Sequence, residues 1–89
     1  MWSKMKVEVL ILIVCDEKFE RAQKYQACTL IEKRVRRVHG IENTSYTGIA
    51  GADITAFACW EEKEIPQYVK EIENIDGIVK VTAKILVTA

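Results

Sequence analysis

The sequence predicts an α+β fold in which a β-α-β unit occurs twice. The stretches Val35–Ile41 and Ile72–Ile78 share one pattern, in which an amphipathic helix ends, a Gly follows and a β-branched residue starts a strand. Two other segments are almost wholly apolar, which is typical of central strands covered on both faces. With 89 residues in all, we expect residues 1–89 to form a single domain.

Composition and charge exclude several classes of protein. The apolar share is 49%, the charged share 29% and the formal net charge zero, so nothing in the overall charge indicates binding to nucleic acid or membranes. The apolar run Val9–Val14 is too short for a signal peptide or a membrane span. The three cysteines are widely spaced and odd in number, unlike a disulfide framework. We therefore expect a cytoplasmic protein.

The first half of the chain begins with a central strand over Val7–Val14, rich in β-branched residues. Acidic residues at Asp16 and Glu17 favour a helix start, and Gly40 can end that helix in the left-handed conformation. The residues expected on its buried stripe are Phe19, Ala22, Ala27, Leu30, Ile31, Val35 and Val38.

The middle of the chain predicts a hairpin. The polar segment Ile41–Ile49 is typical of an edge strand, and Gly48 and Gly51 indicate a turn or bulge before Asp53. Ile54–Trp60 is apolar on both faces and predicts the second central strand.

The second half repeats the helix and strand. A helix is expected from the acidic run at Glu61 through Ile75, with Pro66 tolerated in its first turn. Its buried stripe is expected to contain Ile65, Tyr68, Val69, Ile72 and Ile75. Alternation from Val79 to Val87 then predicts a half-exposed edge strand.

The order β-α-β-β-α-β with right-handed crossovers places strands one and three at the centre of an antiparallel sheet. Both helices then cover one face, which is the ferredoxin-like sandwich. Phe57 and Cys59 point to the other face, so we expect a second subunit to cover it, sheet against sheet. Residues 17–39 carry a net charge of +4 and residues 61–76 a net charge of −4, so the helices could attract one another within or between subunits.

Asp53 is the polar residue with the strongest case for a functional role. It follows a flexible turn and precedes a buried strand, so its carboxylate is both fixed and reachable. Two interpretations remain open. The carboxylate can cap backbone N–H groups of the turn, or it can recognise the ammonium group of a small ligand between subunits.

Other charged residues give weaker indications. Lys33, Arg34, Arg36 and Arg37 either contact nucleic acid or simply complement the negative end of the helix dipole. His39 is expected on the surface of a turn, and no acidic residue near it in the sequence completes a catalytic dyad. The carboxylates of Glu61, Glu62 and Glu64 lack metal-ligand spacing, so no metal or other cofactor is expected.

The residues Gly51–Phe57, Ile65-Pro66 and Ile72–Lys80 resemble the effector-binding (RAM) domain of the Lrp/AsnC transcription regulators, which also occurs as a stand-alone protein. The resemblance implies a dimeric α/β barrel, with further assembly into rings of dimers, and amino-acid binding between subunits. Carried over residue by residue, it nominates Gly51, Asp53 and Thr82 as ligand-binding. The DNA-reading helix-turn-helix is absent, so it implies no direct DNA binding and a role for a partner regulator.

The sequence thus predicts a non-enzymatic, oligomeric module that binds a small effector, with an amino acid as the expected ligand. The turn Gly48–Asp53 would offer N–H groups to a carboxylate. The alternative is a small enzyme of the dimeric α/β barrel type, a monooxygenase or isomerase acting in the barrel cleft. Its reactive groups would have to come from Cys59, Tyr46 and His39. A third hypothesis is an adaptor that binds nucleic acid through the basic helix end.

Overall fold

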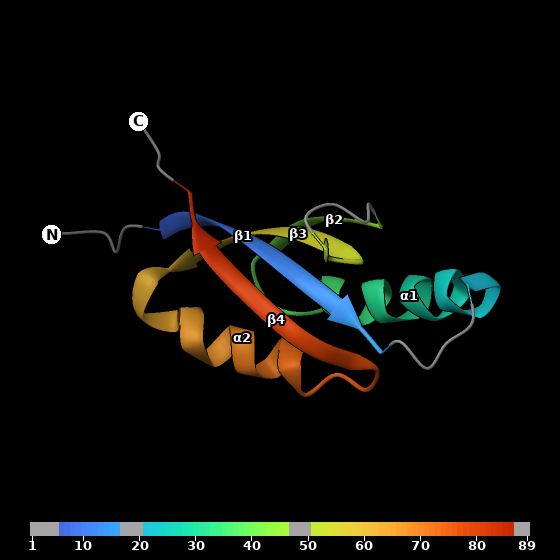
Figure 1. The fold of residues 1–89 in the computed structure, drawn as a ribbon. Coiled ribbons are helices and arrows are strands. Elements are labelled where there is room, and N and C mark those ends of the chain that lie inside the picture. Colours follow the sequence, from blue (N-terminus) through green and yellow to red (C-terminus); the bar gives the residue numbers. More distant parts are fainter. Residues whose placement is uncertain (1–5, 17–20, 47–50, 87–89) are drawn as a thin grey trace, which may run out of the picture.

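The computed structural model describes residues 6–16, 21–46 and 51–86, with the side chains of the first helix from residue 26 onward. The elements along the chain (Figure 1) are β1 (Lys6–Cys15), α1 (Arg21–Arg36), β2 (Ile41–Tyr46), β3 (Ile54–Glu61), a 3-10 helix η2 (Glu62–Glu64), α2 (Ile65–Glu73) and β4 (Ile78–Ile85). This is the β-α-β-β-α-β order that the sequence predicts. The expected start of the first helix at Glu17 and the turn residues 47–50 lie outside the described residues.

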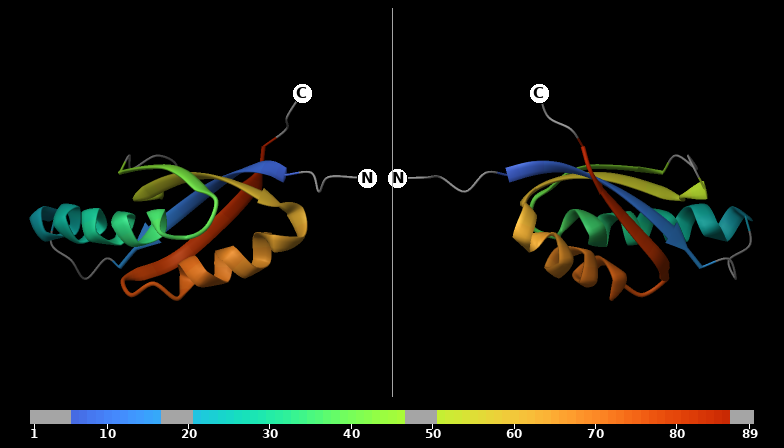
Figure 2. Two further views of the ribbon diagram at one scale, coloured as in Figure 1. Left: turned by 180° about the vertical axis from the view of Figure 1, so that it is seen from behind. Right: turned by 60° about the vertical axis from the view of Figure 1, so that its left-hand side comes forward.

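The four strands form one antiparallel sheet in the order β2-β3-β1-β4. The two apolar strands, β1 and β3, are therefore central, and the two polar strands are at the edges. Both helices lie on the same side of the sheet, α1 against β2 and α2 against β4, so the molecule has two layers (Figures 1 and 2). The predicted ferredoxin-like α+β fold is confirmed.

The core lies between the sheet and the helices, and strand alternation explains which residues form it. Every second residue of β1 from Val9 to Cys15 has no exposed surface. In β3 the same holds for Ile54, Ala56, Ala58 and Trp60, and the helices contribute Cys28, Ile31, Val35 and Ile72. Each large apolar side chain buried in this way contributes about 1.5–3 kcal/mol to folding.

The expected stripe of α1 is wrong at Leu30, which is 62% exposed. The stripe that faces the sheet is Cys28, Ile31 and Val35, spaced three and four residues apart. Leu30 precedes Ile31 by one residue and is therefore turned about 100° away from it. Phe19 and the side chain of Ala22 lie outside the described residues.

The second half differs from expectation at both ends of its helix and in its last strand. The helix expected from Glu61 begins only at Ile65, because Glu61 is the last residue of β3 and the 3-10 helix η2 follows it. The helix α2 ends at Glu73 rather than Ile75, because the Ile75 N–H bonds the Ile72 carbonyl at 3.0 Å in a tighter turn. Val79 and Ile85 were expected on the half-buried side of the last strand but are 65% and 48% exposed. The pairing of β1 with β4 shifts between Val14 and Cys15, and this irregularity interrupts the alternation just where Val79 lies.

Candidate functional site

The end of β1 carries the clearest candidate site, because Asp53 is anchored there. The Asp53 N–H donates to the Ile13 carbonyl at 2.8 Å, and Oδ2 of Asp53 accepts the Cys15 N–H, also at 2.8 Å. The residue therefore extends the pairing of β3 with β1 and fixes its own carboxylate at the sheet end. A bond of this kind to a charged acceptor is worth about 1.5–3 kcal/mol. The capping interpretation of Asp53 thus has a structural counterpart, although the capped N–H belongs to β1 rather than to the local turn.

Gly51 reaches this site through its backbone conformation. Its φ is +78°, in the left-handed region, and a Cβ built on it would meet no atom within 4 Å. Glycine is needed here for the turn and not for space. Ala52, between Gly51 and Asp53, is 2% exposed and seats the turn against the core.

Thr82 lies on the other side of β1 from Asp53. It is half-buried in β4 and stands opposite Leu12, while Thr55 of β3 stands opposite Leu12 from the other direction. The three nominated residues therefore gather at one end of the sheet, with β1 between Asp53 and Thr82. The backbones of β3 and β4 are two strand spacings apart, about 10 Å. Thr55 was not named from the sequence. Strand alternation could have identified it, because a residue two positions after Asp53 lies on the same face of the strand.

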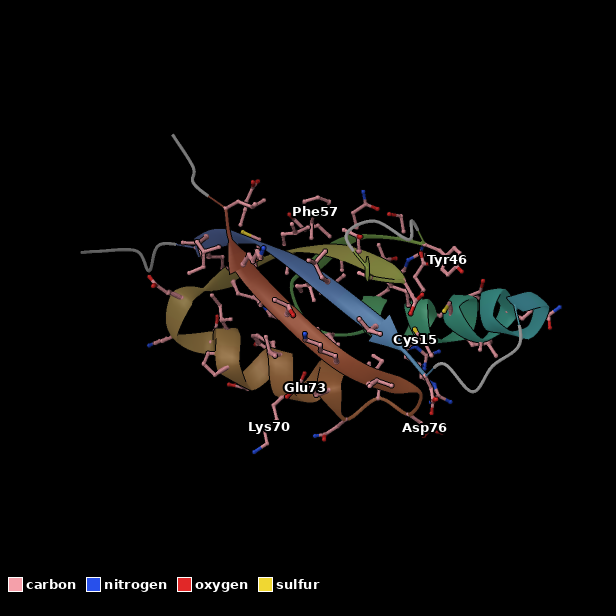
Figure 3. All side chains as sticks on the ribbon, in the orientation of Figure 1. Cys15, Tyr46, Phe57, Lys70, Glu73 and Asp76 are labelled. Atoms are coloured by element: carbon pink, nitrogen blue, oxygen red, sulfur yellow. The ribbon has the colours of Figure 1, made fainter. Side chains whose placement is uncertain are left out.

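The sheet face opposite the helices is an apolar surface that neither α1 nor α2 covers. Leu10, Leu12 and Val14 of β1 lie on it, together with Phe57 and Cys59 of β3. Phe57 is 41% exposed, and Figure 3 shows it on the opposite side of the sheet from α2. This arrangement matches the expectation that Phe57 and Cys59 point away from the helices. We refer to these five residues as the open face.

The three residues considered for an enzyme are not brought together. Cys59 lies on the open face, whereas the exposed His39 lies near Tyr68, which packs with the core on the helix side. Tyr46 pairs with Ile54, five residues along β3 from Cys59, which separates them by about 17 Å. In the described part of the chain these groups form no common reactive centre.

The four basic residues at the end of α1 differ in their contacts. Nε of Arg36 donates to the Thr44 hydroxyl at 2.6 Å, and its guanidinium pairs with Glu32 at 2.7 Å. The Thr44 hydroxyl donates in turn to Glu32 at 2.8 Å. Arg36 thus serves to join α1 to β2. Lys33, Arg34 and Arg37 remain exposed.

An aromatic cluster connects the two helices, and sequence reasoning did not anticipate it. Trp60 stacks on Tyr68 with ring centroids 5.1 Å apart, and its indole N–H donates to the His39 carbonyl. Removal from water raises the pKa of the Tyr68 hydroxyl above its ordinary value, and the negative charges of Glu64 and Glu71 add to the rise. The cluster fixes the end of the first helix against α2.

Neither a metal site nor a membrane span is found within the described ranges. Among those residues no three His, Cys, Asp or Glu side chains are grouped so that they could hold a metal ion. No helix in the same ranges is long and apolar enough to cross a bilayer.

Among the comparisons with known proteins, only the comparison with solved structures gives matches. No protein-family model matches the sequence, and no curated protein matches it either. TTHA0845 from Thermus thermophilus matches with a TM-score of 0.72 and 14% identity, over 93% of this chain and 95% of that one. MtbAldR matches with a TM-score of 0.73 and 14% identity, over 93% of this chain and 52% of that one.

AsnC from E. coli matches with a TM-score of 0.69 and 17% identity, over 97% of this chain and 54% of that one. The chain therefore spans about half the length of MtbAldR and AsnC and almost the whole length of TTHA0845. At these identities the likeness is one of fold. The predicted resemblance to the effector-binding domain of Lrp/AsnC regulators is confirmed at that level.

Proposed function

We propose that this protein is a regulatory module that binds a small effector, an amino acid, between two copies of the chain. The observation that carries the proposal is the likeness of fold to AsnC and MtbAldR over nearly the whole of this chain. An effect on transcription would pass through a partner regulator that supplies the DNA-reading surface.

The open face supports the dimer that this proposal requires. Phe57 and the outward residues of β1 give it an apolar centre, and contiguous apolar surface of this kind is unusual on a monomer. Two sheets that pack face to face bury such surfaces at a separation of about 10 Å. We infer that a second copy, packed sheet against sheet, covers the open face.

The anchored carboxylate of Asp53 suits the ammonium group of an amino acid. A carboxylate offers about four acceptor positions, so one that accepts the Cys15 N–H can accept an ammonium as well. The turn at Gly51 would donate N–H groups to the ligand carboxylate, and the Thr82 hydroxyl would complete the polar contacts. Because Asp53 and Thr82 stand on opposite sides of β1, the remaining walls of a closed pocket would come from the second copy.

The test is a calorimetric and thermal-shift screen of the twenty amino acids. At a ligand concentration of about 100 times Kd, binding stabilises the folded state by about 2.7 kcal/mol, which raises Tm by several degrees. The decisive variant is Asp53→Asn, which keeps an acceptor for the Cys15 N–H but loses the charge. We expect the variant to fold with its ligand-dependent shift abolished, while Thr82→Val weakens it.

The result that would overturn this function is the absence of any heat or Tm shift across the whole panel. Retention of full affinity in Asp53→Asn would leave effector binding in place but remove Asp53 from the site. Analytical ultracentrifugation of Phe57→Lys tests the dimer separately, because a buried lysine at that position would split it.

A further inference from the structure

We infer that the exposed face of α1 binds the acidic end of α2 in a different copy of this chain, through a contact separate from the open face. The basic face consists of Leu30, Lys33, Arg34 and Arg37. The acidic end consists of Glu71, Glu73 and Asp76, with Val79 beside it. All eight residues are exposed in the single chain.

The basic face is one continuous surface. At 100° per residue, Leu30, Lys33 and Arg34 fall within about 100° of the helix circumference, and Arg37 lies in the turn directly after Arg36. Glu32, the acidic residue nearest to them in sequence, is turned toward Arg36 and Thr44, with its side chain only 12% exposed. Its charge is therefore already engaged, and the three cations of the basic face have no acid beside them in the described part of α1.

The acidic end is unfavourable where it stands, and this suggests that it has a partner. Acidic side chains at a helix C-terminus oppose the negative end of the dipole, each at a cost of some tenths of a kcal/mol. After Lys70, the three charged residues up to Asp76 are all acidic. Figure 3 shows Glu73 and Asp76 on the α2 side of the molecule, away from the open face. Cations supplied from outside would relieve this repulsion.

Each charged surface also carries one of the two most exposed large apolar side chains among the described residues. Leu30 is 62% exposed at the centre of the basic face, and Val79 is 65% exposed three residues after Asp76. An apolar centre with a charged rim is the usual arrangement of a protein interface. Phosphate binding would gain nothing from Leu30, and the negative end of the α1 dipole repels phosphate. The observations therefore favour a protein surface over nucleic acid as the occupant.

The two surfaces do not pair within one copy. The turn after α2 approaches α1 at Gly77, where a Cβ would come within 2.8 Å of Cδ1 of Ile31, on the buried stripe. On α1, Lys33 lies about 160°, Leu30 about 100° and Arg34 about 60° around the helix from Ile31. Among the described side chains, none of the three cations forms an ion pair with the acidic end. Another copy of the chain carries the complementary surface and can supply the missing partner.

Such a contact is heterologous, because one copy gives its basic face and another its acidic end. Individual surface ion pairs are weak and screened by salt, so the assembly depends on concentration and ionic strength. It does not depend on effector binding. Loss of the effector site and loss of this contact are therefore separable results.

The experiment is a charge exchange followed by mass measurement at low salt and at high salt, about 20 mM and about 500 mM NaCl. The first variant reverses the basic face (Lys33→Glu, Arg34→Glu, Arg37→Glu), and the second reverses the acidic end (Glu71→Lys, Glu73→Lys, Asp76→Lys). We expect wild type to form a species at low salt of at least twice the mass seen at high salt. Each variant alone should remain at the high-salt mass. An equimolar mixture, and a chain that carries both reversals, should regain the larger species.

A neutral control separates a specific contact from general attraction between opposite charges. Leu30→Ser leaves every charge in place and should weaken the low-salt assembly at least tenfold, with an unchanged circular dichroism spectrum. Equal masses for wild type at both salt concentrations would overturn the proposal, as would failure of the mixture to assemble. Salt-sensitive binding of wild type to a mixed-sequence DNA duplex that the first variant loses would assign the basic face to nucleic acid instead.

Discussion

Both β-α-β halves end their helix at a glycine with positive φ, but the groups packed around the two glycines differ. Gly40 and Gly77 follow the two helices with φ of +85° and +94°. A Cβ on Gly40 would overlap the Trp60 ring and lie 2.8 Å from the Cys59 carbonyl oxygen. A Cβ on Gly77 would meet the flexible end of Ile31. A repeated sequence pattern thus fixes the backbone conformation in both halves but not how closely each glycine is packed.

Both helices pack apolar side chains against the sheet, but the first half adds a polar attachment that the second half does not show among the described residues. In the first half, Arg36, Glu32 and Thr44 form a hydrogen-bonded group that joins α1 to the edge strand β2. In the second half, α2 meets the core through Ile72 and through partly buried side chains such as Val69. Polar contacts have strict geometric requirements, so substitutions should cost more in the first half than at matching positions of the second.

The largest expected effect is the loss of stability on substituting Gly40, compared with the same substitution at Gly77. Gly40→Ala combines about 1–2 kcal/mol of backbone strain with about 1–3 kcal/mol of overlap against a ring and a carbonyl that cannot move aside. We expect a total loss of about 3 kcal/mol in the free energy of unfolding, measured by urea denaturation. Gly77→Ala should cost only about 1–2 kcal/mol, because Cδ1 of Ile31 can rotate away.

Gly51→Ala is the matched control for this comparison. Its φ of +78° carries the same backbone strain, while a Cβ there meets nothing within 4 Å. The loss measured for Gly51→Ala therefore gives the strain alone, and subtracting it leaves the packing cost at the other two glycines. Equal losses for Gly40→Ala and Gly77→Ala would show that the cost comes from backbone strain alone. Packing around the glycine would then not distinguish the two halves.

The next effect tests the polar attachment of the first half. Thr44 is 6% exposed and joins Arg36 to Glu32 through its hydroxyl. Thr44→Val keeps the shape but removes the hydroxyl, so Glu32 loses a donor in a largely buried position. We expect a loss of about 1–2 kcal/mol in the free energy of unfolding. Thr44→Ser, which retains the hydroxyl, should lose less than half of that, and a reversed order would contradict the role of the hydrogen bond.

The sequence was sufficient for the fold because local signals and hydrophobic period agree along most of the chain. The apolar runs of β1 and β3, the two glycine stops and the polar edge strands all indicate the same topology, which the structure confirms. Leu30, Val79 and Ile85 were placed on buried faces but are exposed. Leu30 lies one residue outside the stripe of α1, and Val79 lies at an irregular point in strand pairing that no local pattern marks.

The candidate site was less accessible to sequence reasoning. The turn before Asp53 identified a fixed carboxylate, but not that its partner would be the Cys15 N–H, 38 residues away. The Trp60–Tyr68 stacking and the sharing of Arg36 between Glu32 and Thr44 depend on tertiary geometry. Contacts between residues far apart in the chain cannot be predicted from one sequence when no known motif contains both residues.

The smallest expected effect is on pH dependence, at the point where the two halves meet. The pKa of Tyr68 is raised by its removal from water and by Glu64 and Glu71, so the folded state keeps the hydroxyl proton at pH values where the unfolded chain loses it. Stability from this proton is fully present below the ordinary tyrosine pKa of about 10 and is lost as pH rises through the folded-state value. The difference in unfolding free energy between wild type and Tyr68→Phe should therefore be constant from about pH 7 to about pH 9 and should fall above about pH 10. The other groups that titrate in this range are common to both proteins and cancel in the difference. A difference that instead rises with pH in that alkaline range would mean that the environment favours the phenolate, and the contact of Tyr68 with the acidic helix would then need another explanation.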